Sequence, residues 1–398
     1  MATFSVRFLG CKVSHTDAHA VREALVADGH AEVAAAAGGD VAVVNTCCVT
    51  HEAVSKSRQA ASRAARTHAR VYVTGCGANL EGAWGGLPDN VVVVAKRSEE
   101  TPEFVAGDVG AIGCVRDDTR LERVRAFVKI QDGCSFSCAF CVVPLVRGGT
   151  RSRAASAILD EIRRRVRQGH KEVVLTGINL GLFRDPDRGW RLPRLLREAA
   201  AVDGLARLRL SSIEVNHVSA ELVAAVRESP TVAKHLHVPL QSGDDRVLSE
   251  MRRRYTVATY LRRLEPLREV ANLTADVIVG FPGEDEAAFA CTLRAVDDAG
   301  ITKVHVFPYS PRPGTRTAAA DTVPAAVKKE RAARLRAWSD EACRRRWASK
   351  LGTEDTVLVD RPGRGYGDDY TPWLVDAPVG SLVRVRAGAV TEEGVRAA

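Results

Sequence analysis

Long apolar runs are absent from this sequence of 398 residues. The longest strongly apolar stretch is residues 91–95, whereas a membrane-spanning helix needs roughly 20 such residues. Residues 1–10 also lack the positive stretch and apolar segment of a secretory signal. The sequence therefore predicts no membrane partner, and we expect a cytoplasmic protein.

Cysteine is too scarce for a protein held together by disulfides. The chain has 10 Cys, far below the density of more than about 8% that is typical of disulfide scaffolds. In a reducing compartment such thiols are free, catalytic or bound to metal. With 45% hydrophobic and 27% charged residues, the composition is that of a globular protein with two or three cores. The placement of the cysteines decides which chemistry they serve.

Positive charge is concentrated in the middle of the chain. Of 57 Lys and Arg and 49 Asp and Glu, residues 1–120 hold 12 and 14, and residues 353–398 hold 5 and 8, which leaves 40 and 27 for the middle section. This excess favours a polyanionic partner such as nucleic acid, because clustered Lys and Arg neutralise phosphates. An arginine-rich, solvated surface is the alternative.

Alternating strands and helices are predicted in the first section. Alanine-rich stretches separate short β-rich runs at 5–9, 41–44, 71–74 and 91–94. This pattern is typical of a parallel α/β sheet. Because the carboxyl ends of parallel strands share one edge, cysteines at three of these ends are expected to converge there. They are Cys11, Cys47 and Cys76. The alternative is that each is merely a small buried hydrophobic residue.

A strand, loop and helix recur six times in the middle section. The predicted strands are 127–130, 172–175, 205–210, 235–240, 274–279 and 302–307. Helices are indicated by apolar residues at helical spacing, as at Ile158 and Ile162 before a stop at Gly169. Six such units form an open doubly wound sheet or an incomplete TIM-type barrel. In both folds the chemistry belongs in the loops that follow the strands.

The end of the chain changes character twice. Residues 328–350 predict a long helix that is rich in Lys and Arg. Short strands then lie between Gly, Pro and Asp turns, at 356–359, 373–375 and 382–386. These strands predict a small β-barrel or sandwich.

A C-x3-C-x2-C triplet follows the first strand of the middle section. Its members are Cys134, Cys138 and Cys141. Three thiolates so close together can hold an iron-sulfur cluster, and a missing fourth cysteine leaves one iron open to a ligand. A structural zinc site usually takes four protein ligands. A zinc site and unbound thiols are therefore the weaker alternatives.

This triplet, with Phe140 before its last cysteine, resembles the hallmark of the radical S-adenosylmethionine (SAM) enzymes. Together with the three strand-end cysteines and the terminal β-domain, it makes the chain similar over nearly its full length to the methylthiotransferases of that superfamily. The branch acting on threonylcarbamoyladenosine in tRNA is the most similar, on the segments 10–13, 174–181, 239–243 and 308–315.

The resemblance implies an α/β fold in three parts. The first is an N-terminal parallel α/β methylthiotransferase domain, and the second is a partial TIM-type (βα)6 radical SAM barrel that ends in the basic helix. The third is a small all-β, TRAM-like (OB-like) RNA-binding barrel. We expect these domains at 1–118, 121–352 and 353–398.

Two [4Fe-4S] clusters and SAM are the cofactors that the resemblance implies. The triplet would hold the cluster whose open iron binds the amino and carboxylate groups of SAM. The strand-end cysteines would hold a second cluster, which carries the sulfur to be inserted. All six would thus be both catalytic residues and metal ligands: Cys11, Cys47, Cys76, Cys134, Cys138 and Cys141. Cys48 beside Cys47, and Ser14 in place of the family's usual Asn, depart from the pattern and leave Cys48 open as an alternative ligand.

SAM binding is expected in the loops after the barrel strands, by their position in the superfamily. Gly177 allows close approach of the backbone, and hydroxyl and carboxylate groups suit the ribose and the amino group. Simple βα turns are the alternative. The candidate residues are Phe140, Thr176, Gly177, Asn179, Ser211, Ser212, Glu214, Gln241 and Gly280.

The implied substrate is adenosine 37 of the tRNA anticodon loop, which would receive a methylthio group at C2. A low-potential electron donor and a sulfur donor are implied as further partners. Arg147, Arg151 and Arg153 follow the triplet, and we expect them to contact phosphates together with the basic helix 328–350. The terminal β-domain has more acidic than basic residues and is expected to attract RNA less.

Two other functions remain open. One is modification of an aspartate on a ribosomal protein, which the same family performs and which only substrate recognition distinguishes. The other is a non-catalytic iron-sulfur regulator that binds RNA. The six barrel units with candidate SAM loops count against a regulator, because a sensor needs no such machinery.

Overall fold

The computed structural model describes residues 1–110 and 124–398, which form two compact units. Of these residues, the first unit holds 1–110, Asp132–Thr150 and Ser310–Ala318. The second unit holds 124–131, Arg151–Tyr309 and Ala319–Ala398. The expected boundary between the first two domains, at 118–121, lies outside the described residues, so the three-part division remains a prediction.

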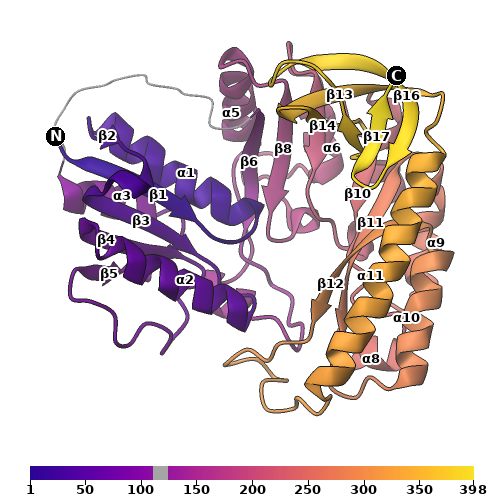
Figure 1. Ribbon diagram of the computed structural model, residues 1–398, viewed down its shortest axis with the longest axis horizontal. Coiled ribbons are helices and arrows are strands. Elements are labelled where there is room, and N and C mark those ends of the chain that lie inside the picture. Colours follow the sequence, from indigo (N-terminus) through magenta and orange to yellow (C-terminus); the bar gives the residue numbers. More distant parts are fainter. Residues whose placement is uncertain (111–123) are drawn as a thin grey trace. The chain divides into compact units, whose positions relative to one another are not determined.

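A five-stranded parallel sheet forms the body of the first unit (Figure 1), and its strand order is β2-β1-β3-β4-β5. The four strands expected from the sequence are confirmed, and the very short β2 was not expected. The elements of this unit are β1 (Thr3–Phe8), α1 (Lys12–Ala27), β2 (Ala31–Glu32), β3 (Gly39–Thr46), α2 (His51–Ala64), β4 (His68–Gly75), β5 (Val91–Val93), α3 (Thr101–Val109) and α4 (Val143–Arg147).

Helices cover both faces of this sheet, which is why the middle residues of its central strands, 41–44 of β3 and 71–73 of β4, are apolar. Val43 is fully buried in a cluster with Leu25 of α1 and Val105 of α3. Its neighbour Val44 points to the opposite face and packs with Ala60 of α2. The alternation of side chains along a strand thus divides one apolar run between two cores.

Six parallel strands of the second unit follow one another in chain order. They form the runs β6-β8-β9 and β10-β11-β12, with β7 at the edge beside β6. Isolated parallel bridges, such as Ser212 with His237, join β9 to β10. Sequential order is the order of a barrel, so the structure favours the partial TIM-type barrel over a doubly wound sheet.

The remaining elements complete this barrel and the end of the chain. They are β6 (Arg125–Asp132), β7 (Arg151–Ser152), α5 (Ala155–Arg167), β8 (Glu172–Gly177), α6 (Leu192–Ala200), β9 (Arg207–Leu210), α7 (Ala220–Glu228), β10 (His235–His237), α8 (Asp245–Glu250), α9 (Val257–Arg268), β11 (Asn272–Val279), α10 (Glu286–Asp298), β12 (Ile301–Pro308), α11 (Ala325–Ala348), β13 (Glu354–Arg361), β14 (Arg364–Tyr366), β15 (Pro372–Leu374), β16 (Leu382–Thr391) and β17 (Gly394–Ala397).

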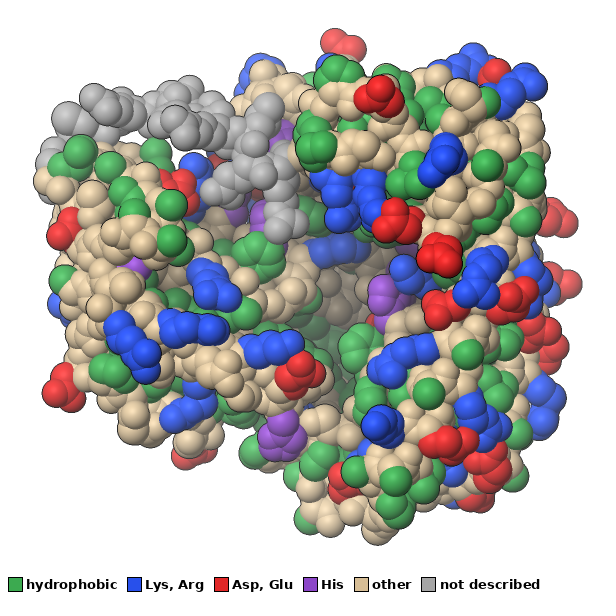
Figure 2. All heavy atoms as spheres, viewed as in Figure 1, with side chains coloured by type: hydrophobic (Ala, Val, Ile, Leu, Met, Phe, Trp, Pro, Cys, Tyr) green, Lys and Arg blue, Asp and Glu red, His purple; other side chains and the backbone are tan. Residues whose placement is uncertain are grey.

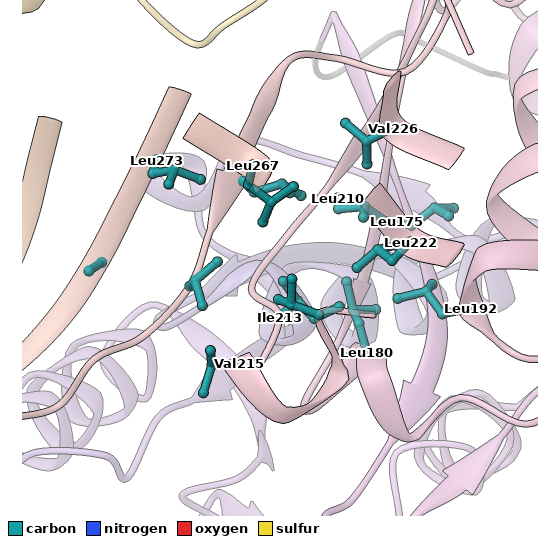
Figure 3. Packing of buried hydrophobic residues seen from close by; sticks show 14 of the residues in the cluster. Leu175, Leu180, Leu192, Leu210, Ile213, Val215, Leu222, Val226, Leu267 and Leu273 are labelled. Carbon is teal, nitrogen blue, oxygen red and sulfur yellow. The ribbon is translucent and has the colours of Figure 1, made fainter. Parts of the chain in front are cut away.

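The core of the second unit lies between the barrel strands and their helices. Figure 3 shows Leu175 of β8 and Leu210 of β9 beside Leu222 of α7, and all three are at most 2% exposed. Burying each such side chain contributes about 1.5–3 kcal/mol. Helix ends fall where the sequence predicts them: α5 ends before Gly169, which has a φ of +95° and donates its N–H to Val166 O.

The last five strands close into a small barrel, in the order β13-β14-β15-β17-β16. Trp373, which is 1% exposed, fills its centre together with Val357 and Val395. The expected small all-β barrel is therefore confirmed. The basic helix expected at 328–350 is α11, and within the described ranges no helix is long and apolar enough to cross a membrane.

A buried charge cluster lies at the amino ends of the barrel strands. The Glu172 carboxylate is fully buried, within 3.2 Å of the guanidinium groups of Arg125, Arg207 and Arg209. Burial alone raises the pKa of Glu172, but Arg209 and Arg125 outweigh it and hold that pKa below its usual value. Arg125 also pairs with Asp360 of β13 at 3.3 Å. The acidic end of the chain thus neutralises part of the excess charge of the middle section.

Candidate active site

The three strand-end cysteines lie at one edge of the first unit's sheet. Cys11 is the N-cap of α1, while Cys47 and Cys76 directly follow β3 and β4. Strands β1, β3 and β4 are neighbours, so the carboxyl ends of all three meet. The approach is close, because a Cβ added to Gly10 would lie 3.1 Å from Cys47 Cβ. The convergence expected from the sequence is found in the structure.

These thiols differ in exposure and acidity. Cys11 is exposed, whereas Cys47 and Cys76 are 8% and 6% exposed. Burial raises the pKa of Cys47 to about 11, and the neighbouring Cys76 and Cys11 add to this rise. Cys48 is fully buried and packs with Cys76, and the neighbouring Cys48 thiol lowers the pKa of Cys76. The acidity of the two buried thiols therefore depends on burial and on the neighbouring thiols.

The cysteine triplet lies in a tight loop between β6 and α4. Cys134 donates its N–H to Gly148 O at 3.0 Å, and Cys141 donates its N–H to Cys138 O at 3.2 Å. Gly133 has a φ of +65°, and a Cβ there would collide with the backbone of Gly149. Glycine is thus required where the loop closes. All three triplet thiols are partly exposed.

Arg147 connects the triplet loop to the strand-end cysteines. Its Nε donates to Cys76 Sγ at 2.8 Å, and its Nη2 donates to Asp17 Oδ2 at 2.7 Å. Its Nη1 donates to both carboxylate oxygens of Asp132, at 2.9 and 3.0 Å. Arg147 is only 8% exposed and ends the short helix α4. The expectation that Arg147 contacts phosphates is wrong, because its guanidinium group is buried and already engaged by Asp17, Asp132 and Cys76 inside the first unit.

The other arginines that we expect to contact phosphates also have partners within the second unit. Arg153 donates to Lys129 O and pairs with Glu161 at 2.7 Å. On α11, Arg346 pairs with Asp369 at 2.6 Å. Arg344 and Arg345 also have acidic partners, at 3.2 and 3.7 Å, but remain more than half exposed. On the face drawn in Figure 2, acidic side chains lie among the basic ones over α9 to α11. Fewer basic side chains are therefore available to bind a polyanion than the charge counts predict.

The donor atoms of both cysteine sets fit an iron-sulfur cluster. Within 1–110 and 124–398, no three His, Cys, Asp or Glu side chains converge closely enough for one metal ion. A [4Fe-4S] cluster makes a different demand, because each cysteine binds a separate iron. Two sets of three thiols supply the kind and number of donor atoms that such clusters take. The assignment of these cysteines as ligands remains a prediction.

Two buried polar atoms after β8 and β9 have no hydrogen-bond partner. They are Asn179 Oδ1 and Ser211 Oγ, on residues 8% and 5% exposed. The Asn179 backbone is held in place, since its N–H donates to Gln131 Oε1 at 2.8 Å. Buried polar groups without partners are rare and call for a ligand or water. Both belong to the residues expected to bind SAM.

The other expected SAM residues of the second unit differ in their surroundings. Glu214 accepts from Asn216 and from Arg253, at 2.9 and 3.3 Å. Gly280 donates its N–H to Glu284, and its φ of +70° together with the packed chain of Lys328 leaves no room for a Cβ. Thr176 is 1% exposed, and Ser212 is exposed. Gln241 has an unusual φ of +67°, which marks a constrained turn after β10.

Sequence reasoning missed the acidic partners of Arg147. Asp17 lies on α1 and Asp132 ends β6, both at most 6% exposed. Arg312, 3% exposed, also donates to Cys48 O at 3.3 Å and supports the same edge. The only available signal was position: Asp132 and Arg147 flank the triplet, at two residues before Cys134 and six after Cys141.

Comparison with known sequences identifies two regions of the chain. The profile of the radical SAM superfamily matches residues 128–296, and that of Uncharacterized protein family UPF0004 matches residues 3–85. The chain is 33% identical to the threonylcarbamoyladenosine tRNA methylthiotransferase MtaB of Bacillus subtilis (strain 168), over 99% of this chain and 96% of that protein. It is likewise 33% identical to MtaB of Chlamydia pneumoniae, over 99% and 97%.

Solved structures share the fold at low sequence identity. TsrM from Kitasatospora setae, a radical SAM methyltransferase solved with tryptophan and a SAM analogue, matches with a TM-score of 0.59 and 15% identity, over 79% of this chain and 74% of that one. OxsB, a cobalamin-dependent SAM radical enzyme, matches with a TM-score of 0.53 and 10% identity, over 84% and 56%. These likenesses concern the fold alone.

Proposed function

We propose that this protein is a tRNA methylthiotransferase, because the chain belongs to the MtaB family of methylthiotransferases within the radical SAM superfamily. Relatives of this name are about one-third identical over nearly the full length of both chains. As a member of the family, the protein is a transferase that uses SAM and [4Fe-4S] clusters. The substrate, the product and the residue roles below are our proposal.

The substrate that the relatives' names favour is threonylcarbamoyladenosine in tRNA. We assign the reaction to adenosine 37 of the anticodon loop, where sulfur enters at C2 and is methylated. The base has to leave its stack to reach a cofactor in a loop, as other base-modifying enzymes require. A tRNA substrate also implies action in the cytoplasm.

The two cysteine sets would divide the work. The triplet would hold the cluster that binds SAM, and the strand-end cysteines would hold the cluster that supplies sulfur. When bound, these cofactors supply the radical chemistry and the inserted atom, while the protein orients them. The tight turns at Gly133 and Gly10 allow each loop to approach its neighbour closely. This arrangement of thiols is the observation that carries the proposal.

Asn179 and Ser211 would orient SAM. Their buried, unpartnered oxygens follow adjacent parallel strands, where ligands of such folds bind. A ligand hydrogen bond would remove the cost of leaving these atoms unsatisfied. Glu214, already held by Arg253, would take part as a fixed carboxylate. A low-potential electron donor and a sulfur donor are required as further partners.

Mass spectrometry of tRNA nucleosides tests this proposal. A strain that lacks the gene should lose the 2-methylthio derivative of threonylcarbamoyladenosine and accumulate its precursor. Wild-type protein should restore the product, and Cys134→Ala protein should not. An unchanged nucleoside profile, with loss of methylthioaspartate from a ribosomal protein, would move the enzyme to the alternative substrate.

A further inference from the structure

Arg147 is a buried cation whose three nitrogens serve three different segments of the first unit. Asp17 comes from α1, Asp132 from the end of β6, and Cys76 from the end of β4. A planar guanidinium can satisfy such divergent acceptors at once, whereas a lysine ammonium cannot hold the same fork geometry. The arrangement is therefore specific to arginine.

Substrate binding does not explain this residue. Its side chain is 5% exposed, and the carboxylates of Asp17 and Asp132 are about as buried. Burying an ion pair is costly and is weak evidence of selection for stability. One of its three donors, moreover, points to a sulfur and not to a carboxylate. A role connected with that sulfur accounts for the contact.

Hydrogen bonds to ligand sulfurs change the reduction potential of iron-sulfur clusters. Reduction adds negative charge to the cluster and its thiolates, so an N–H donor stabilises the reduced form more than the oxidised form. Residues that contact metal ligands also fix ligand orientation. Arg147 Nε lies 2.8 Å from Cys76 Sγ, so it can both change the potential and fix the orientation of this ligand.

We propose that Arg147 is a positioning residue for Cys76, and that its hydrogen bond to Cys76 Sγ raises the reduction potential of the strand-end cluster. Through Asp132 it also fixes the end of the strand that leads into the triplet. The inference rests on the proposed function, which makes Cys76 a cluster ligand. The proposal thus assigns a role to a residue that follows the triplet in the chain and whose side chain contacts a strand-end cysteine.

The test uses the full-length chain with Cys134, Cys138 and Cys141 replaced by Ala, so that only the strand-end cluster contributes. In this parent, Arg147→Gln is combined with Asp17→Asn, which removes one charge of each sign and leaves the net charge unchanged. The reduction potential, from an anaerobic redox titration followed by electron paramagnetic resonance, should fall below that of the parent. Asp17→Asn alone keeps the Arg147 donor and removes a negative charge, so it should raise the potential.

A matched control is the exposed pair Arg163 and Asp160 on α5, which lie 2.7 Å apart. Arg163→Gln with Asp160→Asn should leave the potential unchanged. Arg147→Lys, which keeps the charge, serves if the double variant does not load iron, and its potential should also fall. Equal potentials in the parent and in the Arg147 variants would overturn the inference alone. A parent that binds no cluster would overturn the assignment of Cys76 as a ligand, and the inference with it.

Discussion

The strand-end cysteines and the triplet cysteines are brought together in different ways. Cys11, Cys47 and Cys76 come from three strands spread over 66 residues, and only the parallel sheet makes them neighbours. The triplet lies within one loop, closed by the hydrogen bond from Cys134 N–H to Gly148 O. The first set depends on the fold of the whole sheet, and the second depends on a short segment.

The two cysteine sets also differ in their surroundings. Two of the strand-end thiols are buried and lie near Cys48, Arg147 and Arg312. The triplet thiols are partly exposed, as the proposed SAM site would require. Under the proposed assignment, the sheet would provide a site for sulfur supply that is buried at Cys47 and Cys76 and open at Cys11, while the loop would provide a partly exposed site for SAM.

The largest effect is expected from removing the accessible set. Cys138→Ala should abolish both reductive SAM cleavage and methylthio product, because the remaining two thiols cannot hold the cluster that binds SAM. Iron per chain should fall by about half, since each cluster contains four irons. SAM cleavage is measured by chromatography of 5′-deoxyadenosine. Cys291→Ala, a partly exposed cysteine on α10, is the control and should change neither result.

Cutting the link between the two sets should destabilise the first unit. Arg147→Ala leaves Asp17 and Asp132 buried without their cation, which should lower the free energy of unfolding by about 3–5 kcal/mol. Arg163→Ala breaks an exposed pair and should cost no more than about 1 kcal/mol. Chemical denaturation of both variants measures the difference. Equal losses of unfolding free energy in the two variants would mean that the contacts of Arg147 do not hold the triplet loop and the strand-end cysteines together.

A smaller effect is expected at the proposed SAM loops of the second unit. Ser211→Ala should weaken SAM binding about 2–10-fold, the effect of losing one hydrogen bond. Without SAM the variant should be at least as stable as wild type, because Ser211 Oγ has no partner to lose. Ser381→Ala, in an exposed turn of the small barrel, is the control. Loss of stability without a change in the Kd for SAM would contradict the assignment.

The smallest effect concerns tRNA binding. Arg344→Ala with Arg345→Ala should reduce the slope of log affinity against log salt by up to about two units, since each phosphate contact contributes about 0.9. Arg346 is left intact because it is less exposed than these two and pairs with the buried Asp369. Titrations at several salt concentrations measure the slope. An unchanged slope would place the RNA surface elsewhere in the chain.

Much of this account was predictable from local sequence patterns. Cysteines directly after β-rich runs predict a shared edge, because the carboxyl ends of parallel strands lie together. The spacing of the triplet predicts a cluster loop without reference to the rest of the chain. Strands and helix ends, such as the stop at Gly169, follow from periodicity and from glycine's tolerance of positive φ.

Charge pairing was not predictable in the same way. From its sequence position alone, Arg147 is expected at the surface. Asp17 lies 130 residues earlier in the chain, and only the fold places it in contact with Arg147. Glu172 and Arg209 likewise pair across neighbouring strands. The negative charge of the terminal domain becomes intelligible once Asp360 and Asp369 are seen beside Arg125 and Arg346. Counting charges by segment cannot tell which ones the fold has already neutralised.

One measurement tests the division between the two sets most directly. Cys47→Ala protein, reconstituted anaerobically with iron and sulfide, is assayed in parallel for SAM cleavage and for methylthio product on tRNA. The account predicts that cleavage persists while the methylthio product disappears and about half of the iron is lost. A folded Cys47→Ala protein that keeps its triplet cluster but cannot cleave SAM, or one that still forms the product, would contradict the account.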